Sequence, residues 1–248
     1  MGAPASLFRF DELRRFLVTT RAAREIVSIR DHRGGNALVL RHDVDLDLTA
    51  VPRLAELEGV VGVFPTYCVM TTSDLYNPAA PESRRIIRGL ADAGFDVGLH
   101  FWPEAYEGLG GEGLAGKVGE EAALLADITG RSPVALSLHN PTAAGAFPSF
   151  AGYREAYGPE LFAPDRYLSD SRMRLREDPF AFVERTRGVL AQLLLHPEHF
   201  TEEGAGYRAI FAGVERRRAA VIDRYMRVNQ TYADELPDGL LAALERRT

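Results

Sequence analysis

Short apolar segments in this chain repeatedly end in a carboxylate or an imidazole. Between them lie segments with helical spacing of apolar residues, and this alternation of strands and helices is typical of parallel βα units. The carboxyl ends of parallel strands meet at one edge of the sheet, where α/β barrels build their active sites. We therefore expect an α/β fold with its chemistry at that edge. The expected strands cover residues 37–40, 64–70, 95–99, 134–138 and 189–195.

The polar residues at the strand ends are of types that suit a hydrolytic metal site. A lone histidine after a strand carries little information, but its repetition along the chain is hard to attribute to chance. Imidazole and carboxylate are common ligands of zinc and similar ions. Such an ion lowers the pKa of a bound water and polarises the carbonyl that is attacked. The residues concerned are Asp43, Asp45, His100, His139, Asp170 and His196.

The expected helices show how the chain is organised. We find no internal repeat or long linker, and 248 residues can form one domain of this class. We expect a single catalytic domain over residues 1–248, with its motif-bearing core at about 36–200 and a helical segment at about 205–248. The glycine-rich residues 108–113 predict a loop, either a surface connection or a lid on the substrate side. The helices cover residues 11–24, 48–60, 83–93, 117–129 and 207–233.

Composition excludes several classes of protein. The net charge is −6, and no basic block is interleaved with aromatic residues, so we expect no nucleic-acid partner. A single cysteine, Cys68, cannot form an internal disulfide. We see no signal peptide and no run of about 18 apolar residues, which predicts a cytoplasmic protein without a membrane span. The expected partner is a small-molecule or saccharide substrate, and the oligomeric state is open.

Five segments, taken in order, resemble the motifs of the NodB-homology polysaccharide deacetylase superfamily, which includes carbohydrate esterase family 4. They are most similar to a divergent branch found in surface-polysaccharide gene clusters. The resemblance spans about residues 38–197. It implies a deformed (β/α) barrel and a metal-dependent hydrolase that removes an N-acyl group, in the first place acetyl, from an amino sugar or a sugar-linked precursor. The segments are Arg41–Asp45, Gly94–His100, Leu136–Pro141, Tyr167–Ser171 and Leu193–Pro197.

The resemblance also implies a role for each matching residue. Asp43 would be the general base, and Asp45 would be a ligand of one divalent metal ion. Zinc is the first candidate for this ion, and cobalt and nickel are alternatives. His100 would be a second ligand. Asp170 would orient His196, the general acid that protonates the leaving amine.

The chain departs from the family pattern at two points. The second motif usually supplies two metal histidines four residues apart, but position 104 here is Glu. The third ligand is then either Glu104 or His139, and we favour His139 because a rigid strand end places a ligand more precisely than a loop. His139 also stands where the third motif normally has an arginine that holds the base carboxylate. Only Arg41 or His42 is then left to restrain Asp43.

The sequence leaves the role of some other residues open between a structural and a functional interpretation. Asp170 could orient His196 or simply pair with Arg172 or Arg174. His32 and His199 are expected at the surface, although His199 lies near enough in sequence to the candidate acid to touch a substrate.

We place three further residues on the substrate side. Trp102 and Tyr76 could stack on a sugar ring, or they could simply pack. Glu104, if it is not a ligand, joins them. Two other functions also stay open: hydrolysis of a non-sugar amide or an ester, and a metal-free relative that only binds a saccharide or a protein partner.

Overall fold

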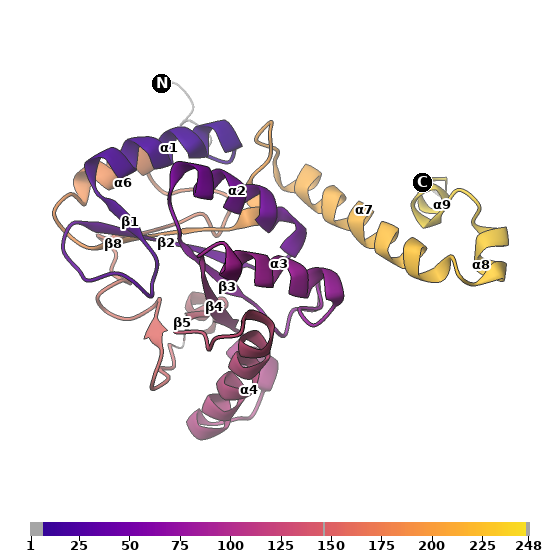
Figure 1. Cartoon of the computed structure of the whole chain (residues 1–248), viewed down its shortest axis with the longest axis horizontal. Helices are drawn as coiled ribbons and strands as arrows, with labels where there is room; N and C mark the ends of the chain where they lie inside the picture. The colour runs from indigo at the N-terminus through magenta and orange to yellow at the C-terminus, as the bar shows by residue number, and fades with distance from the viewer. Residues whose placement is uncertain (1–6, 146, 247–248) are drawn as a thin grey trace. The chain divides into compact units, whose positions relative to one another are not determined.

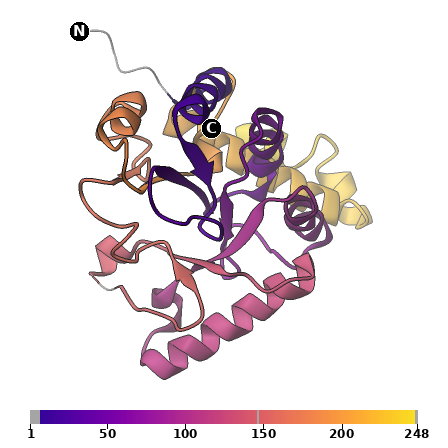
Figure 2. The same ribbon diagram turned by 60° about the vertical axis from the view of Figure 1, so that its left-hand side comes forward.

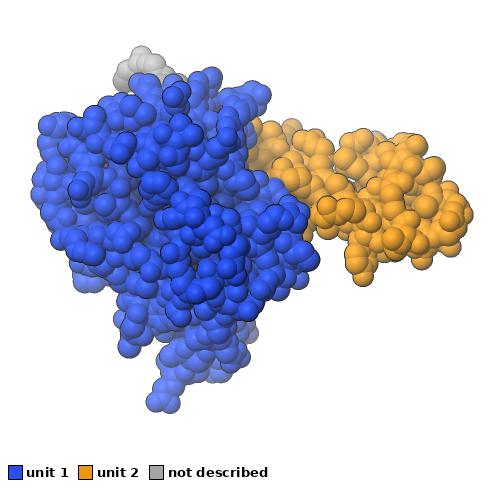
Figure 3. All heavy atoms as spheres, in the orientation of Figure 1, with its two compact units in different colours: residues 1–204 blue, residues 205–248 orange. Residues whose placement is uncertain are grey.

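The computed structural model of the chain describes residues 7–145 and 147–246 (Figure 1). The chain divides into two compact units, residues 1–204 and residues 205–248 (Figure 3). Every candidate site residue belongs to the first unit. The expectation of a single domain over residues 1–248 stays a prediction. Among the described residues, no helix is both long enough and apolar enough to cross a membrane.

An eight-stranded sheet forms the centre of the first unit. Its path is β6-β5-β4-β3-β2-β8-β7, β1 pairs with β2 beside this path, and the pairings are parallel. The strands are β1 (Glu25–Val27), β2 (Ala37–Val44), β3 (Thr66–Val69), β4 (Asp96–Phe101), β5 (Ala135–Leu138), β6 (Arg154–Glu155), β7 (Tyr167–Ser169) and β8 (Ala191–Leu195).

The sheet curls into a half-barrel that stays open between β6 and β7, the two ends of its path, and helices flank it (Figure 2). This confirms the predicted deformed (β/α) barrel. The helices are α1 (Phe10–Ala23), α2 (Val51–Val61), α3 (Pro81–Asp92), α4 (Gly111–Thr129), α5 (Pro141–Ala144), α6 (Pro179–Arg185), α7 (Tyr207–Met226), α8 (Gln230–Glu235) and α9 (Leu240–Glu245). Short 3₁₀ helices are η1 (Leu48–Ala50), η2 (Pro103–Tyr106) and η3 (Pro197–His199).

Strand β2 is buried along its whole length, because strands on one side and helices on the other exclude water from both of its faces. Successive side chains of a strand point to opposite faces. Leu38 and Leu40 pack in the larger core cluster, whereas Ala37 and Val39 pack in a smaller one. Arg41 and Asp43 therefore continue the row that faces the smaller cluster, which lies inside the half-barrel.

Two segments differ from the sequence-based expectation. The glycine-rich residues 108–113 were expected to form a loop, but α4 begins at Gly111. Glycine disfavours a helix by about 1 kcal/mol per residue, and burial of Val118 and Leu125 along the same helix offsets that cost. The helix expected over residues 207–233 is two helices, α7 and α8, because the side chain of Asn229 accepts a hydrogen bond from the Tyr232 backbone N–H and starts a new one.

Candidate metal centre

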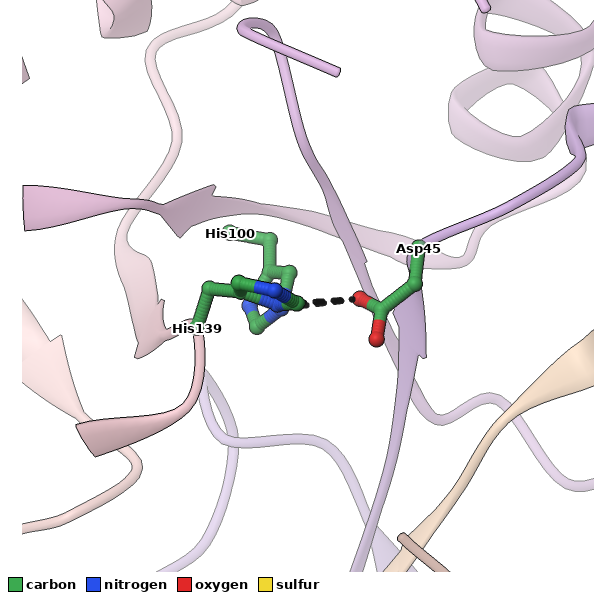
Figure 4. A group of neighbouring side chains, drawn as sticks. All are labelled: Asp45, His100 and His139. Carbon is green, nitrogen blue, oxygen red and sulfur yellow. Dashed lines mark hydrogen bonds and ion pairs between the residues drawn. The ribbon is translucent and has the colours of Figure 1, made fainter. Parts of the chain in front are cut away.

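The ends of three neighbouring strands bring one carboxylate and two imidazoles together. Asp45 follows β2, His100 lies in β4 and His139 follows β5. Their rings and the carboxylate face one another in Figure 4. Asp45 Oδ1 lies 3.0 Å from His100 Nε2 and 3.5 Å from His139 Nδ1, and the two nitrogens are 3.2 Å apart. The same three atoms thus form a nearly equilateral triangle.

The size of this triangle fits a tetrahedral metal ion. Zinc bonds to nitrogen and oxygen are about 2.0–2.1 Å long, which places neighbouring tetrahedral ligand atoms roughly 3.3 Å apart. The three observed separations lie on either side of that value. Oδ1 of Asp45 is buried and takes no hydrogen bond of good geometry from the described residues. Burial would raise the pKa of Asp45, but the facing His100 and His139 outweigh it and hold that pKa well below its usual range. The donor set therefore fits a divalent cation.

Neighbouring side chains orient the two imidazoles. His100 Nδ1 lies 3.1 Å from Ser137 Oγ, and this contact leaves Nε2 turned to the triangle. His139 Nε2 lies 2.9 Å from the side-chain nitrogen of Asn140. When Nδ1 of His139 binds an ion, Nε2 carries the proton, and a half-turn of the Asn140 amide then offers its oxygen as acceptor. Such outer contacts commonly fix the rings of metal-binding histidines.

Arg41 holds the candidate base. Asp43 is buried, and its Oδ2 accepts hydrogen bonds from Arg41 Nη2 at 3.2 Å and from Ser137 Oγ at 3.0 Å. Arg41 Nη2 also donates to Tyr157 Oη at 2.9 Å. His42 points to the opposite face of β2, where its Nε2 lies 2.7 Å from Glu58 Oε1. Of the two restraints that the sequence left open, the structure therefore supplies Arg41.

A second group joins Asp170 to two histidines. Asp170 is fully buried, and its Oδ1 lies 2.6 Å from His196 Nδ1. Its Oδ2 accepts from the His196 backbone N–H at 3.0 Å and lies 2.8 Å from His199 Nδ1. Burial lowers the pKa of His196, but Asp170 outweighs burial and raises that pKa to about 10. The same three residues could in principle ligate a metal, but both carboxylate oxygens are already used by these N–H groups.

This arrangement decides two of the open alternatives. Asp170 pairs with imidazoles, and the alternative pairing with Arg172 or Arg174 is not found among the described residues. His199 was expected at the surface, but it is buried beside Asp170, and Phe8 packs edge-on against its ring at 5.7 Å between centroids. His32 is buried as well. Nε2 of His196 remains on the side of the metal centre, 3.7 Å from Asp45 Oδ2.

One cavity contains the candidate metal centre. Its volume is about 580 Å³, and its lining residues include aromatic residues and two arginines. The lining residues are Asp43, Asp45, His100, Leu138, His139, Asn140, Pro141, Thr142, Tyr157, Phe162, Ala163, Pro164, Tyr167, Ser171, Arg172, Arg176, Leu194 and His196. This places the predicted base, acid and ligands at a single surface open to a ligand.

None of the three residues predicted to contact substrate is among the described lining residues of the cavity. Trp102 packs edge-on against His139, with ring centroids 5.5 Å apart. Tyr76 is buried; its hydroxyl donates to the Val44 carbonyl and accepts from the Met70 backbone N–H. Glu104 is exposed on η2 and is outside the Asp-His-His group. Substrate contact by these three residues stays a prediction.

No protein-family model matches the chain, and no curated protein matches it. Solved structures of similar fold were found. Several of them are described as CE4-family proteins. A chitin deacetylase from the fungus Colletotrichum lindemuthianum is 16% identical, with 74% of this chain and 82% of that one covered and a TM-score of 0.48. An acetyl xylan esterase from Clostridium thermocellum, solved with a cobalt ion, is 14% identical, with 73% and 84% covered and a TM-score of 0.44.

A CE4-family pseudoenzyme from Bacillus anthracis has a similar fold as well. It is 13% identical, 75% of this chain and 63% of that chain are covered, and the TM-score is 0.46. This chain thus spans under two thirds of the length of that protein. The likeness in all three cases is one of fold.

The sequence analysis did not identify two residues near the centre, Ser137 and Glu198. Ser137 links His100 to Asp43, but a serine inside an apolar strand gives no signal of its own. Glu198 lies on η3 close to His196, and its Oε2 is buried without a hydrogen-bond partner among the described residues. Burial raises the pKa of Glu198 to about 8, against the lowering effect of His196.

Proposed function

We propose that this protein is a metal-dependent hydrolase that removes an N-acyl group, in the first place acetyl, from an amino sugar or a sugar-linked precursor. The observation that carries the proposal is the triangle of Asp45 Oδ1, His100 Nε2 and His139 Nδ1. These three residues would hold one divalent ion, with zinc as first candidate and cobalt or nickel as alternatives. Three protein ligands leave a position for water, which is typical of catalytic sites.

Asp43 would act as the general base. When bound, the ion would lower the pKa of a water and polarise the acyl carbonyl. Arg41 and Ser137 occupy Oδ2 of Asp43, whereas its Oδ1 has no hydrogen-bond partner among the described residues. Oδ1 would take the proton of the attacking water.

His196 would act as the general acid. Its Nδ1 is held by Asp170, so the ring has one orientation and its Nε2 stays on the side of the metal centre. The raised pKa of His196, about 10, keeps Nε2 protonated at neutral pH. That proton would pass to the nitrogen of the departing amine as the acyl bond breaks.

The test is acetate release from a panel of N-acetylated sugars, acetylated sugar esters and small acetamides. The protein is assayed as purified, after removal of metal, and after reconstitution with zinc, cobalt or nickel. We expect turnover of at least one N-acetylated sugar, its loss on metal removal and its return on reconstitution. Release from the esters or small amides alone would support the other hydrolase instead.

An Asp43→Asn variant separates the base from the metal ligands. General acid–base groups contribute roughly 10²–10⁴-fold to rate, so turnover should fall by at least about a hundredfold while bound metal is unchanged. Asp92→Asn, an exposed carboxylate on α3, is the matched control and should keep full activity. Unchanged turnover in the Asp43→Asn variant would exclude this residue as the base.

A further inference from the structure

Two arginines line the cavity that contains the candidate metal centre. Apart from the residues already given a role, the charged side chains among its described lining residues are Arg172 and Arg176. The chain as a whole carries a net charge of −6, so these two arginines make a local cationic surface on an acidic protein. If a divalent ion is bound, its charge offsets Asp43 and Asp45 at the base of the cavity. The two arginines then make the remaining charge of the cavity lining positive.

Neither arginine is neutralised by a carboxylate within the described parts of the chain. Arg176 donates from Nη2 to the backbone carbonyls of Pro164 and Tyr167, which hold the guanidinium without cancelling its charge. Arg172 is exposed and forms no hydrogen bond or ion pair with the described residues. Many other exposed arginines of this chain do pair, as Arg185 does with Glu177 at 2.6 Å. A guanidinium left free in a cavity is available to an oxyanion of a ligand.

The backbone fixes where Arg172 stands. The turn that carries it starts at Asp170, whose carbonyl accepts from the Met173 backbone N–H at 2.6 Å. Met173 has a φ of 48°, in the left-handed region that a side chain of this size rarely adopts. Ser171 N–H donates to Ser169 Oγ at 3.0 Å and closes the turn further. Because the side chain of Asp170 also holds the candidate acid His196, the turn that carries Arg172 starts at the residue that orients the acid.

We infer that the amino-sugar part of the substrate carries an oxyanion, a phosphate or a carboxylate, and that Arg172, supported by Arg176, binds it. This inference rests on the proposed function for the identity of the reacting group, but the anion subsite itself does not need hydrolysis. It makes Arg172 a specificity-determining residue that favours charged sugar precursors over neutral sugars.

Binding of the amine products tests the inference without turnover. Isothermal titration of the metal-loaded protein would compare glucosamine, glucosamine 1-phosphate and 2-amino-2-deoxyglucuronate. We expect at least one of the two anionic sugars to bind about tenfold more tightly than glucosamine, as a charge-assisted hydrogen bond would give. Tighter binding of only one anionic sugar would identify its oxyanion, phosphate or carboxylate, as the group that is recognised. Tighter binding of both would show that the subsite accepts either oxyanion.

The matched variants are Arg172→Gln and Arg174→Gln. Arg174 is exposed on the same loop but does not line the cavity. We expect Arg172→Gln to abolish the preference for the anionic sugar and Arg174→Gln to keep it. Equal binding of the three sugars, no binding by any of them, or equal effects of the two variants would overturn the subsite. Failure of the hydrolase proposal would look different: no acetate release, with the Arg172-dependent preference intact.

Discussion

Arg41 is the residue on which the geometry of the candidate base depends most. It is fully buried, and it contacts Asp43, Tyr157 and, through Nη1, Gln192 at 3.2 Å. Its guanidinium also lies 4.6 Å from the centre of the Tyr157 ring. A buried charge is tolerated only when it is paired and hydrogen-bonded in this way. Arg41 therefore both positions Asp43 and keeps the interior electrically balanced.

Removal of Arg41 should destabilise the protein strongly. An Arg41→Gln variant leaves Asp43 buried without its cation, and breaking a buried pair costs about 3–5 kcal/mol. Urea unfolding followed by circular dichroism should show a loss of that order. Arg174→Gln, on the surface, should change stability by less than about 0.5 kcal/mol. A loss of under about 1 kcal/mol in the Arg41 variant would mean that Asp43 does not depend on it.

Asp170 should contribute stability in a defined pH range. Its own pKa is lowered, against burial, mainly by His196, so its contribution is present above its usual pKa of 3.8 and is lost as the pH falls below that. The pKa of His196 is raised from 6.5 to about 10, so that contribution is complete below pH 6.5 and disappears as the pH rises towards 10.

The corresponding variant is Asp170→Asn. The free energy of unfolding of wild type minus variant should be largest, roughly 3 kcal/mol, between the unfolded pKa values of the two groups. It should shrink as the pH is raised from 6.5 to 10. Thermal melts at a series of pH values measure it. A difference that grows over that range would contradict the assigned ion pair.

The residues of the metal centre could be predicted because each one lies at the carboxyl end of a strand, either in its last positions or directly after it. In a parallel sheet such positions converge, whatever the details of packing, so Asp45, His100 and His139 were expected together. The burial of His199 could not be predicted in this way. It depends on Phe8, at the other end of the chain, which packs against its ring. Contacts of that kind arise from tertiary packing and leave no local pattern.

At the scale of the elements, strand β4 packs closely against its neighbours at Gly98. At Gly98 an added Cβ would lie 3.0 Å from the Ala135 Cβ and carbonyl oxygen and 3.1 Å from Cys68 Sγ. Small residues on β3, β4 and β5 thus let the strands curl closely beneath His100, two positions further along β4. The curvature of the half-barrel and the position of a metal ligand depend on the same packing.

A pair of glycine variants tests this packing. Gly98→Ala should destabilise the protein by about 1–3 kcal/mol, because overpacking a filled interior forces strands apart. Gly119→Ala, on the exposed side of α4 with nothing within 4 Å of the new methyl group, should instead stabilise the protein by about 0.5–1 kcal/mol, since alanine favours a helix. Thermal unfolding of the two variants should therefore shift in opposite directions. Stabilisation by Gly98→Ala would contradict this packing, because it would mean that the strands accommodate an added methyl group at this position.

Elements with strong periodicity were predicted well, and short ones were not. The main strands and helices of the first unit lie where their apolar spacing indicates, with ends shifted by a few residues. Strand β6 has two residues and β1 three, too few for any period to appear. Both form because a neighbouring strand offers free backbone groups, which is a tertiary effect. The early start of α4 has the same origin, since packing overrides the weak helix propensity of glycine.

At the scale of the whole molecule, the fold of the first unit explains why the candidate catalytic and metal-binding residues lie together. A curled parallel sheet turns all of its strand ends to one side, so residues far apart in sequence, from Asp43 to His196, line one cavity. The base Asp43 and the candidate ligand Asp45 come from the end of β2, and the other candidate ligands and the acid come from the ends of β4, β5 and β8. The central claim is that three of these residues bind a metal ion.

Metal content tests that claim most directly. It would be measured on the purified protein after reconstitution with zinc, cobalt or nickel, and on the single variants Asp45→Ala, His100→Ala, His139→Ala and Glu104→Ala, each first shown to be folded. We predict about one equivalent in the wild type and in Glu104→Ala, and loss of the ion in the other three. No metal in the wild type, or loss in Glu104→Ala with retention in His139→Ala, would contradict the account.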